Sequence, residues 1–328
     1  MFNSFDRIKI RCDLNDIRII SGEFRKVMSP DMETIISEEF RTVGLKINVN
    51  HQFNKLFIDF SAKLLGGDYT EKINCFTLRE IYKTISNYID IAPMQFYRLS
   101  PNYTESVQDV EIMNIPDTID ALFSLAKLQS KFKTSPKVYK HQNQATSLTL
   151  KKNVLSRASN EFVSIYSKYN ELFAAYKNEN RVYIQSLSEE QLQRIKSYFT
   201  DKLRVEYKCD SKARIRVSFG LENDYNLYHL LRSENNVVET IINEIYVTEL
   251  LPRTKLSGIT HLDLDRLNTL VMHNNDLEKI YESYKSLGGK GQRSKVFKPY
   301  KELLKMKAIE DESEKIKLLE ELKEKLKW

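Results

Sequence analysis

The order of apolar and polar residues predicts mixed α and β structure over the first two-thirds of the chain. Residues 45–50 (LKINVN) and 55–62 (KLFIDFSA) alternate with a period of two on either side of a short polar segment, which predicts a β-hairpin. Residues 106–114 (SVQDVEIMN) alternate in the same way until Pro116 ends the pattern. Further strands are predicted at residues 146–152 and 202–209.

Apolar residues at helical spacing lie between and after these strands. Thr77 and Glu80 have the spacing of a capping box, and an apolar stripe follows them as far as Ile89. Ser188 and Gln191 repeat this spacing at the start of a second helix. Other helices are predicted at residues 119–128, with Asp117 or Thr118 as the cap, and throughout the chain beyond about Arg216.

These elements predict the α+β class, with an α+β domain over residues 1–220 and a helical region over residues 221–328. The last helix is predicted from about Lys301 to the end, with its leucines in a narrow stripe between lysines and glutamates. Such a stripe is typical of a coiled-coil seam or of an arm that folds on its own body. A seam would make this helix the contact between subunits of a homo-oligomer.

The composition is that of a soluble globular protein. Of 328 residues, 41% are hydrophobic and 29% are charged, which excludes a disordered chain. No apolar run approaches the roughly 20 residues of a membrane helix, and charges in residues 1–12 argue against a signal peptide. Three well-separated cysteines indicate neither a disulfide framework nor a zinc site, so a reducing cytoplasm is expected. The net charge of +6 permits a polyanionic partner without requiring one.

Two predicted strands carry acidic residues where a buried strand would carry apolar ones. The period of two places Asp109 and Glu111 on one face of the first strand. On the second, it places Arg204, Glu206 and Lys208 on one face. Neighbouring carboxylates repel unless a cation lies between them, and their oxygens suit Mg²⁺ or Mn²⁺. The alternative is a solvated strand face with a surface ladder of ion pairs.

The segment EFVSIYSKYNELFAAY (161–176) contains a candidate nucleophile. Tyr166 precedes Lys168 by two residues, and Tyr169 and Glu171 follow. A free phenol has a pKa of about 10, so its attack on a phosphodiester needs a nearby metal or lysine. The alternative for Tyr166 is ordinary core packing. For Tyr169 the alternatives are a packed aromatic residue and a second nucleophile that rejoins the strand.

Three short motifs, in this order, resemble the gene II replication proteins of filamentous phages and their plasmid relatives. These proteins are nicking-closing initiators of rolling-circle replication. Their motifs are an Arg-apolar-Asp strand, a Tyr-x-Lys-x-x-Glu segment, and an Arg-x-Glu strand that leads into a basic helix ending in Phe-Gly. The matching residues, between about residues 45 and 225, are Asp109; Tyr166, Lys168 and Glu171; Arg204 and Glu206; and Phe219-Gly220.

The resemblance implies a nuclease domain over residues 1–220, with an antiparallel sheet and flanking helices. It implies that Tyr166 cleaves one DNA strand, forms a 5′-phosphotyrosyl link and releases a free 3′-hydroxyl. Lys168 would orient or neutralise the scissile phosphate or the phenolate. The implied ligands of Mg²⁺ or Mn²⁺ are Asp109 and Glu206; strand geometry adds Glu111, and Glu171 is either a further ligand or the residue that positions Lys168.

The chain departs from the resemblance in two places. Gln108 stands where the family pattern has arginine. The wider superfamily of rolling-circle nucleases has a His-apolar-His metal pair, and none of the five histidines of this chain forms that pair. The metal site is therefore expected to be rich in carboxylates.

Basic residues near these motifs, and in the glycine-containing segment 286–301 (SLGGKGQRSKVFKPYK), are candidates for phosphate contacts. This segment does not match a P-loop, so nucleotide hydrolysis is not expected. The expected partners are origin DNA, single-stranded or supercoiled, and host replication proteins, in the cytoplasm of a bacterial host and without a membrane. The alternative is a non-catalytic DNA-binding replication or structural protein that assembles through its C-terminal helix. The candidate DNA-binding residues are Arg204, Lys208, Lys212, Arg214, Lys290, Arg293 and Lys295.

Overall fold

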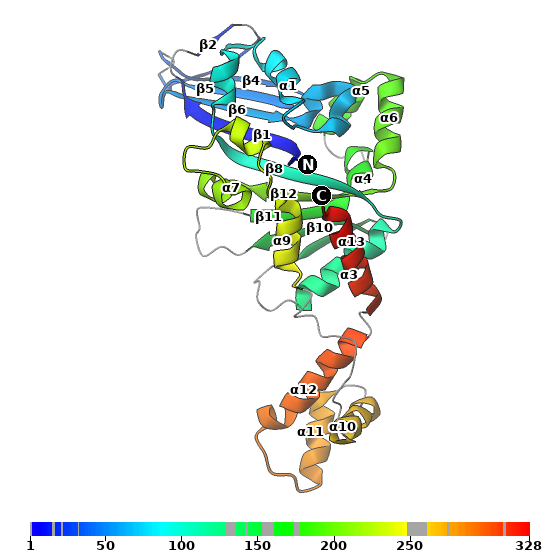
Figure 1. The fold of residues 1–328 in the computed structure, drawn as a ribbon. Helices are drawn as coiled ribbons and strands as arrows, with labels where there is room; N and C mark the ends of the chain where they lie inside the picture. Colours follow the sequence, from blue (N-terminus) through cyan, green and yellow to red (C-terminus); the bar gives the residue numbers. More distant parts are fainter. Residues whose placement is uncertain are drawn as a thin grey trace.

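A ten-stranded sheet organises the molecule, which belongs to the α+β class (Figure 1). The computed structural model describes residues 2–14, 17–20, 22–31, 33–128, 136–141, 144–152, 161–173, 178–247, 261–273, 276–310 and 313–328. Every neighbouring pair of strands in the sheet is antiparallel. The strand order is β3 (Arg25–Met28), β4 (Ile35–Thr42), β5 (Leu45–Asn50), β6 (Lys55–Ser61), β1 (Phe5–Asp13), β8 (Pro101–Glu111), β12 (Lys202–Cys209), β11 (Glu161–Ser167), β10 (Gln144–Lys152) and β9 (Lys137–His141). Two short strands, β2 (Arg18–Ile19) and β7 (Ile89–Asp90), pair separately.

The sheet has one apolar and one polar face, because side chains alternate along its central strands except at bulges. In β1, Ile8 and Ile10 are buried on one face, while Arg7 and Lys9 lie on the other. Helices cover the apolar face, and Figure 1 shows α3 (Ile115–Leu128), α9 (Val237–Ile245) and α13 (Ser313–Leu326) lying together against the half of the sheet that contains β10 to β12. The polar face is partly covered by η1 and α6. The helices of the main body are α1 (Leu78–Ile85), α2 (Pro93–Tyr97), α3 (Ile115–Leu128), α4 (Lys168–Phe173), α5 (Asn178–Gln185), α6 (Glu189–Phe199), α7 (Lys212–Phe219), α8 (Leu227–Leu231), α9 (Val237–Ile245) and the 3₁₀ segment η1 (Ala62–Glu71).

Several predicted elements are confirmed at nearly the predicted bounds. The hairpin is formed by β5 and β6, and residues 202–209 form β12. The capping box of α6 is present, because the Ser188 hydroxyl accepts from the backbone N–H of Gln191 and the Gln191 side chain accepts from that of Ser188. The α7 helix ends at Gly220, whose φ of 64° is the left-handed conformation that glycine adopts without strain.

Other predictions are wrong in detail. Thr77 forms no capping box, since its hydroxyl donates to the carbonyl of Lys72 and accepts from the backbone of Asn74. The predicted apolar stripe runs past the end of α1 at Ile85, and its last residue, Ile89, belongs to β7. The α3 helix begins before the predicted caps, and the side chain of Asn114 accepts from the backbone N–H of Asp117. Four strands of the first 44 residues (β1 to β4), and β9, were not predicted.

The region beyond residue 220 contributes two different parts. Helices α8, α9 and α13 (Ser313–Leu326) add buried side chains to the core of the sheet. A separate small cluster of α10 (His261–Met272), α11 (Leu277–Ser286) and α12 (Arg293–Glu310) packs around Leu270, Ile280 and Leu303. Figure 1 shows this cluster projecting from one end of the main body. Within the described ranges, no helix has the length and apolar content needed to cross a membrane.

The single last helix expected from about Lys301 is in fact two helices, α12 and α13. The leucine stripe of α13 lies against its own body: Leu319, Leu322 and Leu326 are fully buried with α3 and α9. Of the two alternatives for this stripe, the structure has the arm that folds on its own chain. The end of α13 is held by a hydrogen bond of 2.7 Å from the Asn236 side chain to the carbonyl of Leu326.

This packing predicts that α13 is part of the stable core. We expect Leu322→Ala to lower the free energy of unfolding by about 2–4 kcal/mol, because the truncation removes buried methyl groups and leaves a cavity. The matched control is Leu287→Ala, since Leu287 is exposed, and its effect should stay within about 0.5 kcal/mol. Urea unfolding measures both values. Equal effects would mean that α13 does not dock on the sheet in solution.

Candidate metal site on the polar face of the sheet

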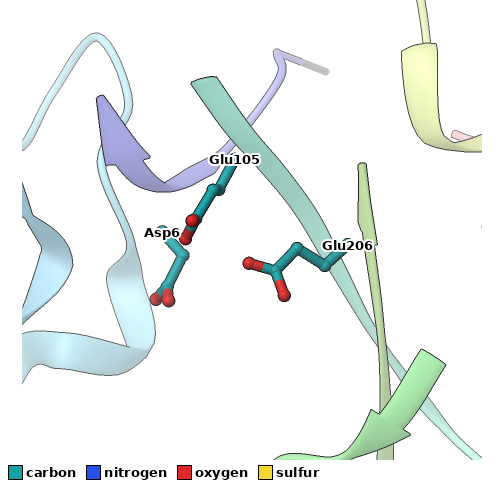
Figure 2. A group of neighbouring side chains, drawn as sticks. All are labelled: Asp6, Glu105 and Glu206. Atoms are coloured by element: carbon teal, nitrogen blue, oxygen red, sulfur yellow. The ribbon is translucent and has the colours of Figure 1, made fainter. Parts of the chain in front are cut away.

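Three carboxylates from three adjacent strands converge on the polar face. Asp6 lies on β1, Glu105 on β8 and Glu206 on β12, and one oxygen of each lies within 4.8 Å of the others. Figure 2 shows the three side chains pointing toward one another. We call these residues the acidic trio. All three are largely shielded from solvent, with side chains 13%, 10% and 3% exposed, respectively.

The strand register explains this convergence. A β-bulge interrupts the pairing of β1 with β8, because Phe5 pairs with Ser106 whereas Arg7 pairs with Glu105. Asp6 is the extra residue of the bulge, a position from which a side chain is directed out of the regular alternation. Glu105 lies opposite Lys208 of β12, and alternation along β12 brings Glu206 to the same face.

The electrostatic environment shifts the pKa values of Asp6 and Glu206 in opposite directions. Burial, followed by repulsion from Glu105, raises the pKa of Glu206 to about 8, and Lys208 at 3.4 Å opposes the rise. Burial also disfavours charge on Asp6, but Lys168 and Arg204, with a hydrogen bond from Tyr69, outweigh it and hold the pKa of Asp6 below its ordinary value. In the metal-free protein Glu206 is therefore protonated near neutral pH.

The donor set fits a hard divalent cation. Carboxylate oxygens are the preferred ligands of Mg²⁺ and Mn²⁺, and Mg²⁺ holds them at about 2.1 Å. The three oxygens lie within 4.8 Å of one another, so they must move inward to bind one common ion at that distance. A cation there would remove the repulsion between Glu105 and Glu206 that raises the pKa of Glu206.

Metal affinity should therefore depend on pH. Below about pH 8 a cation must displace the proton from Glu206, so affinity for Mn²⁺ should fall roughly tenfold for each pH unit. Above that pH the dependence should level off. Calorimetric titrations between about pH 6 and about pH 9 measure this slope. In Glu206→Gln the slope should flatten; an unchanged slope would place the titrating group elsewhere.

Three phenols of the described residues lie at this site, and one of them, Tyr69, donates a hydrogen bond of 2.7 Å to Asp6. Tyr166 on β11 pairs with Arg204, which puts it on the same face as Glu206. Burial and the charge of Glu206 raise the pKa of Tyr166, while Lys168, whose Nζ is 5.7 Å from the ring centre, opposes the rise. Tyr103 donates a hydrogen bond to Glu105, and burial and this carboxylate raise its pKa as well. The phenols are thus protonated in the metal-free protein.

Asp109 is separate from the acidic trio, although the resemblance implied it as a metal ligand together with Glu206. It pairs directly with Arg204 across β8 and β12, and both its oxygens are held by the guanidinium at 2.7 and 2.9 Å. Lys72 adds a third contact at 2.9 Å. The side chains of Asp109 and Arg204 are both 0% exposed. Asp109 therefore serves a buried ion pair, and Arg204 is not open to a DNA phosphate.

The remaining predicted acids also lie outside the trio. Glu111 is exposed at the end of β8, opposite Lys202. Glu171 lies 2.8 Å from Lys168, so of its two predicted roles the structure shows the contact that positions this lysine. Lys168 itself is buried and lies 3.6 Å from Asp6, within reach of the trio. Tyr169 packs on Phe173 with ring centres 4.9 Å apart, as expected of a packed aromatic residue.

The predicted DNA-binding cations are spread over the molecule. Lys208 flanks the trio, 3.7 Å from Glu105. Lys212 and Arg214 lie on α7, where Arg214 is 3.8 Å from Glu161. Three exposed cations belong to the separate cluster of α10 to α12: Lys290, Arg293 and Lys295.

Two residues of the trio were missed from the sequence. Asp6 lies in FDRIKIRCD, where Ile8 and Ile10 alternate with cations and would have indicated a strand. Glu105 lies on β8, which begins five residues before the predicted strand 106–114. The convergence of both with Glu206 depends on pairings between distant segments. Comparisons with protein-family models, with curated proteins and with solved structures find no significant match to this chain.

Proposed function

We propose that this protein is a metal-dependent enzyme that nicks and rejoins one DNA strand at an origin and so initiates rolling-circle replication. The observation that carries the proposal is the acidic trio, on the same sheet face as Tyr166. The order of the motifs around Tyr166, Lys168 and Glu206 supports the choice of DNA as the substrate. A Mg²⁺ or Mn²⁺ ion held by the trio would polarise the scissile phosphate and stabilise charge in the transition state.

The nucleophile of the proposed reaction is the phenol oxygen of Tyr166. Its bond to phosphorus forms as the bond from phosphorus to the 3′-oxygen breaks; the phenol loses its proton, and the leaving oxygen gains one. Lys168 is placed to favour the phenolate, because its charge opposes the rise in the pKa of Tyr166. Neutralisation of Glu206 would remove the charge that raises this pKa. The free 3′-hydroxyl reverses the reaction when the strand is rejoined.

The positive charges of the face fit a phosphodiester. Lys208 lies 3.4 Å from Glu206 and keeps its side chain 31% exposed at the rim of the trio. Arg7 is half-buried on β1, which β8 separates from β12, and two hydrogen bonds to Asp59, at 2.6 and 2.7 Å, already engage its guanidinium. Lys208 therefore supplies phosphate affinity without sequence information.

Cleavage of a labelled single-stranded DNA library tests the proposal. With Mn²⁺ present, we expect cleaved product and a DNA-linked protein band on a denaturing gel, and neither with EDTA. Glu206→Gln should lower the cleavage rate at least about 1,000-fold, because it removes one ligand and its charge. Glu190→Gln, at an exposed position on α6, should leave the rate unchanged.

The second candidate function is a non-catalytic DNA-binding replication protein, and the exposed cations of the α10–α12 cluster favour it. DNA binding without cleavage, with Mn²⁺ at saturating concentration, would establish this function and contradict the proposed enzyme.

A further inference from the structure

A pocket of about 470 Å³ lies between α2 and α8, away from the acidic trio. Its walls are formed by Tyr97 and Arg98 at the end of α2 and by Tyr228 and Arg232 on α8 and just after it. A hydrogen bond of 2.8 Å from the backbone N–H of Leu227 to the carbonyl of Leu99 joins the two walls. The pocket therefore has a fixed shape rather than lying between independent segments.

The pocket is on the opposite side of the sheet from the trio. Phe96 of α2 packs on Phe60, with ring centres 6.0 Å apart. Phe60 pairs with Ile8 on the apolar face, whereas Arg7 and Glu105 lie on the polar face. Any ligand of this pocket is consequently distinct from the group that reacts at the trio.

The charge of the pocket is positive and uncompensated. Arg98, Arg232 and His229 line it, and its lining contains no Asp or Glu. Neither arginine forms an ion pair with another residue in the part of the chain that the structure describes. The arginines of the polar face differ, since Arg7 and Arg204 are both held by carboxylates. Free guanidinium groups at the wall of a hollow are suited to bidentate binding of a phosphate.

Aromatic and apolar side chains stand open around the same hollow. Tyr228 is 46% exposed, and the Arg232 guanidinium lies over its ring, 4.3 Å from the centre. Met94, which also lines the pocket, is 62% exposed. Unpaired cations between exposed aromatic rings match the way proteins bind single strands, with bases stacked on rings and phosphates held by arginine.

We propose that this pocket binds one or two nucleotides of a single DNA strand, with a base against Tyr228 or Tyr97 and phosphate on Arg98 and Arg232. A duplex is excluded as the ligand of the pocket because its base faces are stacked inside the helix. The choice of DNA over RNA rests on the proposed function; the recognition of a nucleotide rests on the pocket alone. The pocket holds a strand segment that flanks the reacting one.

Fluorescence anisotropy of a fluorescein-labelled dT12 oligonucleotide, with the full-length protein in EDTA, tests this site. Arg98→Ala, Arg232→Ala and Tyr228→Ala should each weaken binding about tenfold, and Tyr228→Phe should bind like the wild type because it retains the ring. The matched control is Arg181→Ala, which removes an exposed arginine of α5. Each pocket arginine removed should also reduce the slope of log K against log salt by about 0.7. Pocket variants that bind like Arg181→Ala would overturn the proposal.

Alkylation of Cys75 gives a second readout inside the pocket. Burial raises the pKa of the Cys12 and Cys209 thiols to about 11, so these two residues should react slowly with iodoacetamide. Saturating dT12 should slow the modification of Cys75 at least fivefold in the wild type and not in the Arg98→Ala/Arg232→Ala double variant. An unprotected Cys75, or equal protection by poly-glutamate, would contradict a nucleotide site and, in the second case, indicate an acidic peptide.

These measurements need no catalysis, so the two proposals can fail separately. Loss of dT12 binding in the pocket variants together with an absence of cleavage in the wild type would keep the pocket and reject the nuclease. Cleavage that depends on Glu206, together with unaltered dT12 binding in the pocket variants, would keep the nuclease and reject the pocket.

Discussion

Tyr166→Phe should abolish the DNA-linked form of the protein altogether. The variant keeps the buried ring on β11 and removes only the hydroxyl, so the fold should be unaffected. Without that oxygen no phosphotyrosine can form, and the band should be lost at every metal concentration. Denaturing gels with labelled single-stranded DNA and Mn²⁺ measure the result.

Tyr103, another phenol at the site, supplies the comparison. Tyr103→Phe removes a hydroxyl that donates to Glu105, and we expect it to keep the DNA-linked band with a slower rate. A band that survives in Tyr166→Phe and disappears in Tyr103→Phe would assign the nucleophile to Tyr103. A band that survives in both variants would leave Tyr69, which donates to Asp6, as the remaining phenol at the site and would contradict the assignment of Tyr166.

Arg204→Met should destabilise the fold by about 3–5 kcal/mol. The guanidinium makes two hydrogen bonds to Asp109, one of 3.0 Å to Asp6 and one of 3.2 Å to Tyr69. Methionine fills much of the volume but leaves the carboxylate of Asp109 buried, with Lys72 as the ion-pair partner that remains. Urea unfolding at neutral pH measures the loss.

A double variant separates the lost charge from the lost volume. Arg204→Met/Asp109→Leu removes both partners, so it should recover part of the stability that the single variant loses, because the carboxylate of Asp109 is no longer buried, while Lys72 loses its contact with Asp109. A loss below about 1 kcal/mol in Arg204→Met would mean that the pair is not buried in solution.

Local sequence patterns predicted those elements whose signals lie within one segment. The capping box of Ser188 and Gln191 sets the start of α6, and the alternation of KLRVEYKC sets β12, because side chains close in sequence determine both. The α+β class followed from the same patterns. The strands β1 to β4 were not predicted, although Ile8 and Ile10 alternate with cations along β1.

The candidate site was predictable only in part. The alternation along β12 correctly predicted that Glu206 lies between two cations on one strand face, and Glu206 is one of the three residues of the trio. The role of Asp109 was not readable, because its direct pairing with Arg204 is a property of the register between β8 and β12. Asp6 reaches the site through a bulge, which no local pattern specifies.

The central claim is that Asp6, Glu105 and Glu206 together hold one divalent cation. A calorimetric titration of the protein with Mn²⁺ above about pH 8 tests this claim most directly. We predict one bound ion in the wild type, at least about 30-fold weaker binding in Asp6→Asn, Glu105→Gln and Glu206→Gln, and wild-type binding in Glu111→Gln. Binding that is absent from the wild type, or equal in all these variants, would contradict the account.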